Sequence, residues 1–316
     1  MVSPSSQSAS EHRAGDGACV LVTGARGFTG AYVRAELEAA GYRVVGTVLG
    51  ATAADEVSLD ITSAADCRRV LEQVRPDYVV HLAAISFVHH ESAEAFYQVN
   101  VIGTMNLLQA MADTQLTPRR VLIASSANVY GNAGGFLSEA QAPQPVNHYS
   151  ASKLAMEHLV RTWCDRLPIV VTRPFNYTGV GQELRFLVPK IVSHFVARKP
   201  LIELGNLDVE RDFSDVRVVA HAYRLLLEEP CDGEVVNVCS GKPYSLRAII
   251  ASMQQIAGYE IDVRVNPAFV RASDVRTLVG VADKLHALVG SIDTIAFEDT
   301  LRWMYDSGVM QSTSQR

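Results

Sequence analysis

The chain has 316 residues, of which 48% are hydrophobic and 20% charged, and its net charge at pH 7 is −6. This composition is typical of a soluble globular protein with about two lobes, and the absence of any basic run argues against a nucleic-acid partner. No apolar run reaches membrane-spanning length, residues 1–17 lack the apolar core of a signal peptide, and the five cysteines show no metal-type spacing. We therefore expect a cytoplasmic protein with reduced thiols, no metal site and no membrane partner.

The first half of the chain alternates short apolar strands with amphipathic helices. Residues 18–22 form a strand, a glycine-rich turn leads into a helix that ends before Gly41, and residues 42–48 form a second strand. Further strands are predicted at 57–60, 78–82, 120–125 and 169–173, with helices at 63–74, 92–112 and 149–166. This alternation predicts an α/β fold with a doubly wound (Rossmann) parallel sheet.

After residue 174 the alternation breaks. We predict helices at 187–198, 216–227, 246–257 and 297–306, with strands at 235–238 and 261–265, the first of which is able to rejoin the sheet. We expect a larger domain of residues 18–175 plus 212–243, a smaller C-terminal lobe of residues 176–211 plus 244–307, and tails at 1–17 and 308–316.

The glycine-rich turn has the form Gly24-x-x-Gly27-x-x-Gly30 between a strand and a helix. Glycines permit close approach of the backbone to a pyrophosphate, and the helix presents its N-terminal amides. The turn predicts dinucleotide binding by the larger domain, with a purely structural tight turn as the alternative. The second strand ends without an acid until Asp55, and Arg26 lies in the turn, which favours NADP(H) over NAD(H); a solvated Arg26 is the alternative.

Tyr149 and Lys153 are four residues apart at the start of a predicted helix, so they share one face. An ammonium beside a phenol favours the phenolate and lowers the pKa of the phenol, which makes an acid–base group. The alternative is a surface Tyr and Lys on an ordinary amphipathic helix.

Several motifs occur in a fixed order along the chain: Thr23-Gly24-x-x-Gly27-x-x-Gly30, His81-Leu82-Ala83-Ala84, Asn100, Ser125-Ser126, Tyr149-x-x-x-Lys153 and Arg173-Pro174-Phe175-Asn176. Together they resemble the extended short-chain dehydrogenase/reductase family. Residues 205–216 and Arg271-x-x-Asp274-Val275 resemble its GDP-mannose 4,6-dehydratase and GDP-4-keto-6-deoxy-D-mannose reductase group, and are most similar to the reductase.

The resemblance implies a role for each matching residue. Ser126 would bond the substrate oxygen, Tyr149 would exchange its proton, Lys153 would lower the pKa of Tyr149 and hold the nicotinamide ribose, and Asn100 would support the Lys through water. The cofactor would contact Gly24, Arg26, Gly27, Phe28, Thr29, Gly30, Asp60, Ile61, Leu82, Ala83, Ala84, Tyr149, Lys153 and Pro174. The GDP-sugar would contact Ser86, Ser126, Asn176, Lys190, Arg211, Arg271 and Asp274. For Lys190, Arg211 and Arg271 the alternative is a solvated charge or a surface ion pair, which without the resemblance is preferred for Lys190.

The position two residues after Ser126 distinguishes the reactions of this group. Dehydratases carry a Glu there as a base, whereas this chain has Asn128, which has no useful basicity. We therefore predict reduction of the C4 ketone of GDP-4-keto-6-deoxy-D-mannose to GDP-D-rhamnose. A nucleotide-sugar 4-epimerase and a non-catalytic dinucleotide-binding sensor are the alternatives.

Three further expectations concern histidines and assembly. His89 and His90 are interpreted as polar loop residues, because neighbouring side chains point apart and no ligand cluster accompanies them. His148 either begins the helix or contacts the sugar. The apolar faces of helices 92–112 and 149–166 resemble the dimer contact of the family, which implies a homodimer.

Overall fold

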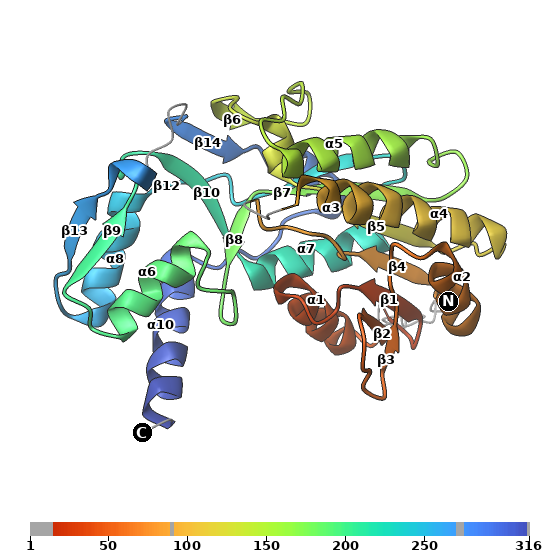
Figure 1. Cartoon of the computed structure of the whole chain (residues 1–316), viewed down its shortest axis with the longest axis horizontal. Helices are drawn as coiled ribbons and strands as arrows, with labels where there is room; N and C mark the ends of the chain where they lie inside the picture. Colours follow the sequence, from red (N-terminus) through yellow and green to blue (C-terminus); the bar gives the residue numbers. More distant parts are fainter. Residues whose placement is uncertain (1–14, 89–91, 270–274, 315–316) are drawn as a thin grey trace, which may run out of the picture.

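A parallel sheet forms the centre of the larger domain (Figure 1). The computed structural model describes residues 15–88, 92–269 and 275–314, and within them the largest sheet has seven parallel strands in the order β11-β7-β5-β4-β1-β2-β3. Its strands are β1 (Cys19–Thr23), β2 (Arg43–Val48), β3 (Glu56–Ser58), β4 (Tyr78–His81), β5 (Arg120–Ala124), β7 (Ile169–Pro174) and β11 (Val235–Val238). The predicted doubly wound α/β fold is confirmed, and β11 rejoins the sheet beside β7.

Helices cover both faces of this sheet. They are α1 (Phe28–Ala39), α2 (Ala64–Val74), α4 (Thr104–Asp113), α5 (His148–Arg161) and α7 (Val216–Glu228). Val20 and Val22 of β1 pack against α1 and α7, whereas Leu21 packs against α2, α4 and α5. Because successive strand residues point to opposite faces and both faces of the central strands are buried, these strands are mainly hydrophobic.

The helix predicted over residues 92–112 contains a π-helical segment. It consists of α3 (Ala93–Tyr97), the π-helical residues Gln98–Gly103 and α4. Short π-helical segments recur at functional sites, and this one contains Asn100, which is fully buried. A hydrophobic pattern of helical period does not reveal such a segment, so the sequence predicted only a continuous helix.

A capping box fixes the start of α5. The Asn147 side chain accepts a hydrogen bond from the Ser150 amide at 2.9 Å, and the Ser150 hydroxyl accepts one from the Asn147 amide at 3.2 Å. This reciprocal arrangement satisfies two amides that lack a partner within the helix. Tyr149 and Lys153 therefore occupy the first two turns of a helix whose starting residue is well defined.

The smaller lobe combines short strands with three packed helices, α6 (Leu187–Val196), α8 (Leu246–Ala257) and α10 (Phe297–Ser314), drawn at the left of Figure 1. Its strands are β6 (Gly135–Leu137), β8 (Asn176–Thr178), β9 (Leu201–Leu204), β10 (Glu210–Asp215), β12 (Pro243–Ser245), β13 (Asp262–Val265) and β14 (Thr277–Gly280), whereas α9 (Asp283–Val289) packs against β11 and α7 of the larger domain. One sheet has the order β12-β10-β14-β6 with β8 also beside β10, and β13 pairs with β9. The sequence did not predict most of these strands, because three to six residues of mixed polarity show no clear period.

The predicted C-terminal tail from residue 308 is wrong. α10 continues through Gly308 to Ser314, and a Cβ atom at Gly308 would lie 2.8 Å from Cγ2 of Val196 on α6. Gly308 therefore lies inside the helix and does not mark its end. The missing side chain lets α10 approach α6 closely. Across the described ranges no helix, α10 included, is long and apolar enough to span a bilayer.

The buried Asp212 carboxylate on β10 makes a testable contribution to stability. It accepts hydrogen bonds from the Ser240 amide and hydroxyl at 2.8 and 2.7 Å, from the Gly241 amide at 2.9 Å and from the Gly280 amide at 3.2 Å. Asp212→Asn places an amide NH2 against one set of these donors, so we expect the free energy of unfolding to fall by about 3 kcal/mol in urea titrations. Asp208→Asn, at an exposed ion pair, is the control and should change it by less than ~0.5 kcal/mol. Equal stability of the two variants would contradict this role for Asp212.

Candidate active site

The predicted functional residues gather at the carboxyl ends of the parallel strands. Thr23 ends β1, His81 ends β4, Ala124 ends β5 and Pro174 ends β7. All of these strands run in the same direction, so their last residues lie at one edge of the sheet. In open α/β sheets this edge is where ligands bind.

The glycine-rich turn has the geometry of a phosphate cradle. Gly24 has a φ of +71°, and a Cβ atom there would lie 3.0 Å from the amide nitrogen of Ala83. A Cβ atom at Gly30 would lie 2.3 Å from the Gly24 carbonyl oxygen, so neither position accepts a larger residue without rearrangement. Gly27 precedes α1, and no side chain caps the first amides of this helix. These amides suit the diphosphate of a dinucleotide, and the residues present therefore fit such a cofactor.

Tyr149 and Ser126 contact each other, and Lys153 lies beside them. The Tyr149 phenol is buried and hydrogen bonded to Ser126. The Lys153 ammonium is also buried and donates to the carbonyl oxygen of Ala124 at 2.8 Å. Asn100 does not contact Lys153 in any described interaction; its side chain instead bonds the backbone of Ile85 and the hydroxyl of Ser152.

The pKa of the Tyr149 phenol is shifted in the direction opposite to the prediction. Burial raises the pKa of Tyr149 to about 12, although the hydrogen bond to Ser126 opposes this shift. Burial likewise lowers the pKa of Lys153 to about 8, against the field of Glu157. Desolvation disfavours the charged form of both groups, and the ammonium bonds Ala124 rather than the phenol. At neutral pH the phenol is therefore a proton donor.

A buried ion pair that was not predicted supports Lys153. Glu157, one turn further along α5, binds Arg173 of β7 through bonds of 2.9 and 2.6 Å, and it also accepts from Ser125 at 2.5 Å. Glu157 is the charged partner that opposes the loss of the Lys153 proton. Its spacing of four residues from Lys153 on the same helix face is the signal from which it could have been found.

Arg26 has an acidic partner in the structure. Its guanidinium donates to both carboxylate oxygens of Glu56 at 3.0 and 2.6 Å, while its own side chain is 56% exposed. The expected cofactor preference rested on the residues that follow β2, whereas β3 pairs alongside β2 and brings Glu56 next to the glycine-rich turn. Arg26 is therefore not simply a solvated side chain, because it binds Glu56. To bind a 2′-phosphate, its guanidinium must either bond both groups at once or release Glu56.

The other residues predicted to contact the cofactor have local partners. Asp60 accepts from the amide and hydroxyl of Thr62 at 2.9 and 2.6 Å, and Ile61 is buried. The amides of Leu82 and Ala83 both donate to the Thr23 hydroxyl at 3.1 Å.

The residues predicted to hold the substrate fall into three groups. Asn176 on β8 and Arg211 on β10 lie on neighbouring strands, where Asn176 donates to the Asp212 carbonyl oxygen at 3.0 Å and Arg211 to that of Val275 at 2.9 Å. Lys190 lies apart from them on α6 and donates to the Glu203 carbonyl oxygen at 3.1 Å. Ser86 is exposed just after β4. The predicted residues Arg271 and Asp274, with His89 and His90, lie outside the described residues.

His148 occupies the first position of α5 and contacts Tyr97. The Tyr97 hydroxyl lies 3.2 Å from Nδ1 of His148, and their rings are 6.0 Å apart. Among the described residues no three His, Cys, Asp or Glu side chains are grouped to hold a metal ion.

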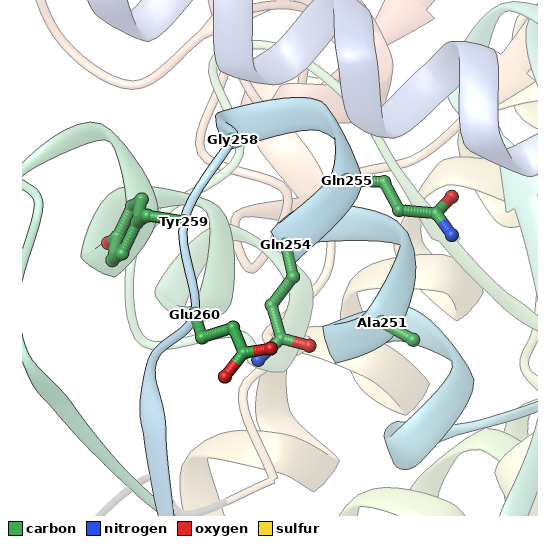
Figure 2. Close-up of a pocket in the computed structure, with 6 residues that line it drawn as sticks. All are labelled: Ala251, Gln254, Gln255, Gly258, Tyr259 and Glu260. Atoms are coloured by element: carbon green, nitrogen blue, oxygen red, sulfur yellow. The ribbon is translucent and has the colours of Figure 1, made fainter.

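A shallow pocket lies far along the chain from these residues. Figure 2 shows it at the end of α8 in the smaller lobe, lined by Ala251, Gln254, Gln255, Gly258, Tyr259 and Glu260. It contains none of the predicted site residues and one carboxylate without a neighbouring base, so we assign no chemistry to it.

Comparisons with known proteins agree with this geometry. Residues 20–239 match the NAD dependent epimerase/dehydratase family. A GDP-6-deoxy-D-talose 4-dehydrogenase from Aggregatibacter actinomycetemcomitans is 39% identical over 279 residues, which cover 86% of this chain and 91% of that protein. A GDP-6-deoxy-D-mannose reductase from Pseudomonas aeruginosa is 35% identical over 243 residues, which cover 72% and 78%.

Solved structures are similar over nearly the whole chain. A candidate epimerase from Burkholderia cenocepacia J2315 has a TM-score of 0.89 and 47% identity, covering 93% of this chain and 98% of that one. RMD from Pseudomonas aeruginosa, solved in complex with NADPH, has a TM-score of 0.82 and 29% identity, covering 93% and 99%.

The lowered pKa of Lys153 predicts a dependence of stability on pH. Its ordinary value is 10.5 and its folded value about 8, so between these limits the unfolded chain binds more protons, and the stability of the fold rises with pH. Lys153→Met removes the buried ammonium, so at pH 7 this variant should be more stable than the parent protein by up to about 3 kcal/mol. The difference should shrink as the pH approaches 10. Urea unfolding at pH 7 and 9.5 measures it, and a variant less stable than the parent at pH 7 would contradict the shift.

Proposed function

Because the chain belongs to the NAD dependent epimerase/dehydratase family, we propose that it reduces the C4 ketone of GDP-4-keto-6-deoxy-D-mannose to GDP-D-rhamnose. The observation that carries this proposal is the pair of hydrogen bonds that Asn128 donates to the Ser126 Oγ atom, beside a buried Tyr149 phenol whose raised pKa keeps it neutral and able to donate a proton. Reduction needs a proton donor beside the carbonyl oxygen, whereas the reverse reaction needs a base.

Asn128 sets the polarity of the Ser126–Tyr149 contact. Its backbone amide and its side-chain amide both donate to the Ser126 Oγ atom, at 3.2 and 3.1 Å. A hydroxyl oxygen has two lone pairs and one hydrogen, so with both lone pairs occupied Ser126 acts only as a donor, toward Tyr149 before the substrate binds and toward the carbonyl oxygen of a bound substrate. The Tyr149 hydrogen is then directed to a substrate oxygen. A carboxylate at position 128 would accept the Ser126 hydrogen instead and reverse this order.

The reaction follows from these donors. The glycine-rich turn and the first amides of α1 would hold a reduced nicotinamide dinucleotide, and the chemistry that this cofactor would supply is a hydride for the carbonyl carbon of the sugar. As negative charge develops on the carbonyl oxygen, the Ser126 hydroxyl donates to it and the Tyr149 phenol transfers its proton, which completes the alcohol. The Lys153 ammonium stabilises the phenolate that remains, and solvent returns the proton to Tyr149.

The substrate is proposed from the two relatives and from the smaller lobe. Both relatives are named for GDP-linked 6-deoxy sugars whose hexoses differ in configuration at C4. Asn176 and Arg211 on neighbouring strands offer an amide and a guanidinium, which suit the hydroxyl and phosphate groups of a nucleotide diphosphate. Reduction from the opposite side, to GDP-6-deoxy-D-talose, is the second candidate, because the dehydrogenase relative is 39% identical.

The proposal also includes the ligand that each domain binds and the oligomeric state of the protein. Residues 18–175 plus 212–243 bind the dinucleotide, and residues 176–211 plus 244–307 bind the nucleotide sugar. Two chains form a homodimer through the apolar faces of the helices at residues 92–112 and 149–166.

Turnover with a defined substrate tests the reaction. We expect GDP-4-keto-6-deoxy-D-mannose to consume one NADPH per molecule and to give GDP-D-rhamnose, which NMR distinguishes from the talo product. Tyr149→Phe removes the proton donor, so turnover should fall by at least ~100-fold while NADPH still binds; Tyr259→Phe in the smaller lobe is the control. Full turnover by Tyr149→Phe refutes the assignment.

Two other results for the parent protein would point to the alternative functions. Interconversion of sugars without net cofactor use indicates an epimerase, and NADPH binding without turnover indicates a sensor.

The cofactor preference is tested at Arg26. We propose that NADP(H) is favoured over NAD(H), supported by Arg26 in the turn and by the NADPH complex of RMD. Arg26→Ala should raise the Kd for NADPH about tenfold, because it removes about 1.4 kcal/mol of charge-assisted hydrogen bonding. The Kd for NADH should change little. Glu56→Gln should lower the Kd for NADPH by removing a carboxylate near the 2′-phosphate. Arg68→Ala, at an ion pair on α2, is the control. Tighter binding of NADH than of NADPH by the parent protein would contradict the preference.

A further inference from the structure

A continuous series of hydrogen bonds links the glycine-rich turn to the π-helical segment through His81. Nδ1 of His81 lies 2.7 Å from the Thr23 hydroxyl, and Nε2 lies 2.9 Å from the Thr104 hydroxyl. The Thr104 hydroxyl donates to the Asn100 carbonyl oxygen at 2.8 Å. All four residues are buried, with exposed fractions of 4% or less.

The partners determine which nitrogen of His81 carries the proton. Thr104 has one hydrogen, which it donates to the Asn100 carbonyl, so it must accept from His81 Nε2. The Thr23 oxygen accepts the amides of Leu82 and Ala83, so its own hydrogen points to Nδ1. His81 is therefore the neutral Nε2–H tautomer, and every bond in the series runs in one direction, which strengthens each bond through its neighbours.

The series continues from Asn100 to the acid–base residues. The Asn100 amide donates to the Ser152 hydroxyl at 3.0 Å, and Ser152 donates to the Tyr149 carbonyl oxygen at 2.8 Å. The other end of the Asn100 amide accepts from the Ile85 backbone at 3.0 Å. The backbone carbonyl of Asn100 thus accepts a hydrogen bond from Thr104, and its side-chain amide binds Ser152 near the start of α5.

We propose that His81, as its Nε2–H tautomer, is a positioning residue that uses Thr104 and Asn100 to set the first turn of α5 relative to the glycine-rich turn. The inference rests on the proposed function for its effect on turnover. His81 itself touches neither the carbonyl oxygen site nor the turn amides of α1, so it acts through other residues.

Two observations fit a positioning role better than simple filling of space. A π-helical segment is rare and recurs at functional sites, and the Asn100 carbonyl within this one is bonded by the Thr104 hydroxyl. In addition, burial and the neighbouring Lys153 lower the pKa of His81 to about 3, so the imidazole stays neutral and the direction of the series does not change over the working pH range.

Substitutions at Thr104 separate positioning from stability. Thr104→Val keeps the shape of the side chain but cuts the series between His81 and Asn100, so we expect kcat for the keto sugar to fall about tenfold while KM for NADPH changes by less than about twofold. Thr104→Ser retains the hydroxyl and should restore most of kcat. Thr114→Val is the matched control, because the Thr114 hydroxyl makes the same bond to a carbonyl four residues earlier on α4, at 2.7 Å, without a histidine partner. Thr104→Val should lower Tm no more than Thr114→Val does.

The results that overturn the inference are distinct from failure of the proposed function. Unchanged kcat in Thr104→Val, or equally slow Thr104→Ser, contradicts positioning. Independently of any substrate, NMR of the 15N-histidine protein, assigned with His81→Gln, should show a slowly exchanging proton on Nε2; a proton on Nδ1, or on both nitrogens at pH 7, also overturns it. If the parent protein does not reduce the keto sugar, the proposed function fails and the tautomer alone decides the inference.

Discussion

The site depends on burying a phenol and an ammonium together at the start of α5. Tyr149 and Lys153 are both almost inaccessible to solvent, and each charge would be costly there without a partner. In the structure the Tyr149 phenol is neutral and lies beside Ser126, and the Lys153 ammonium donates a hydrogen bond to the Ala124 carbonyl oxygen. The capping box that begins the helix and the Glu157 carboxylate one turn later are best explained as parts of this arrangement.

The direction of hydrogen bonds carries as much information as their presence. The two donors of Asn128 leave Ser126 able only to donate, and in our proposal the Tyr149 hydrogen is then directed to a substrate oxygen. A single carboxylate in place of that amide would supply a base and reverse the polarity. Within a family that shares one fold, the choice between adding and removing a proton can therefore depend on one side chain beside the catalytic hydroxyl.

The central sheet and the spacing of Tyr149 and Lys153 were predictable because hydrophobic periodicity and helical geometry are local properties of the sequence. The pKa shift was not, since desolvation depends on what tertiary packing places over the side chain. The pairing of Arg26 with Glu56 arises from two strands lying side by side, and strand neighbours cannot be deduced from spacing. Gly308 was misread as the end of a helix because its packing partner on α6 is over a hundred residues away. The residue roles inferred from the motifs remain predictions.

The most direct measurement follows the hydride. NADPH carrying deuterium at the transferable position of the nicotinamide is incubated with the protein and GDP-4-keto-6-deoxy-D-mannose, and the product sugar is examined by NMR. Our account predicts one deuterium at sugar C4 for each cofactor oxidised. Product with ordinary hydrogen at C4, or with deuterium at any other carbon, would contradict it.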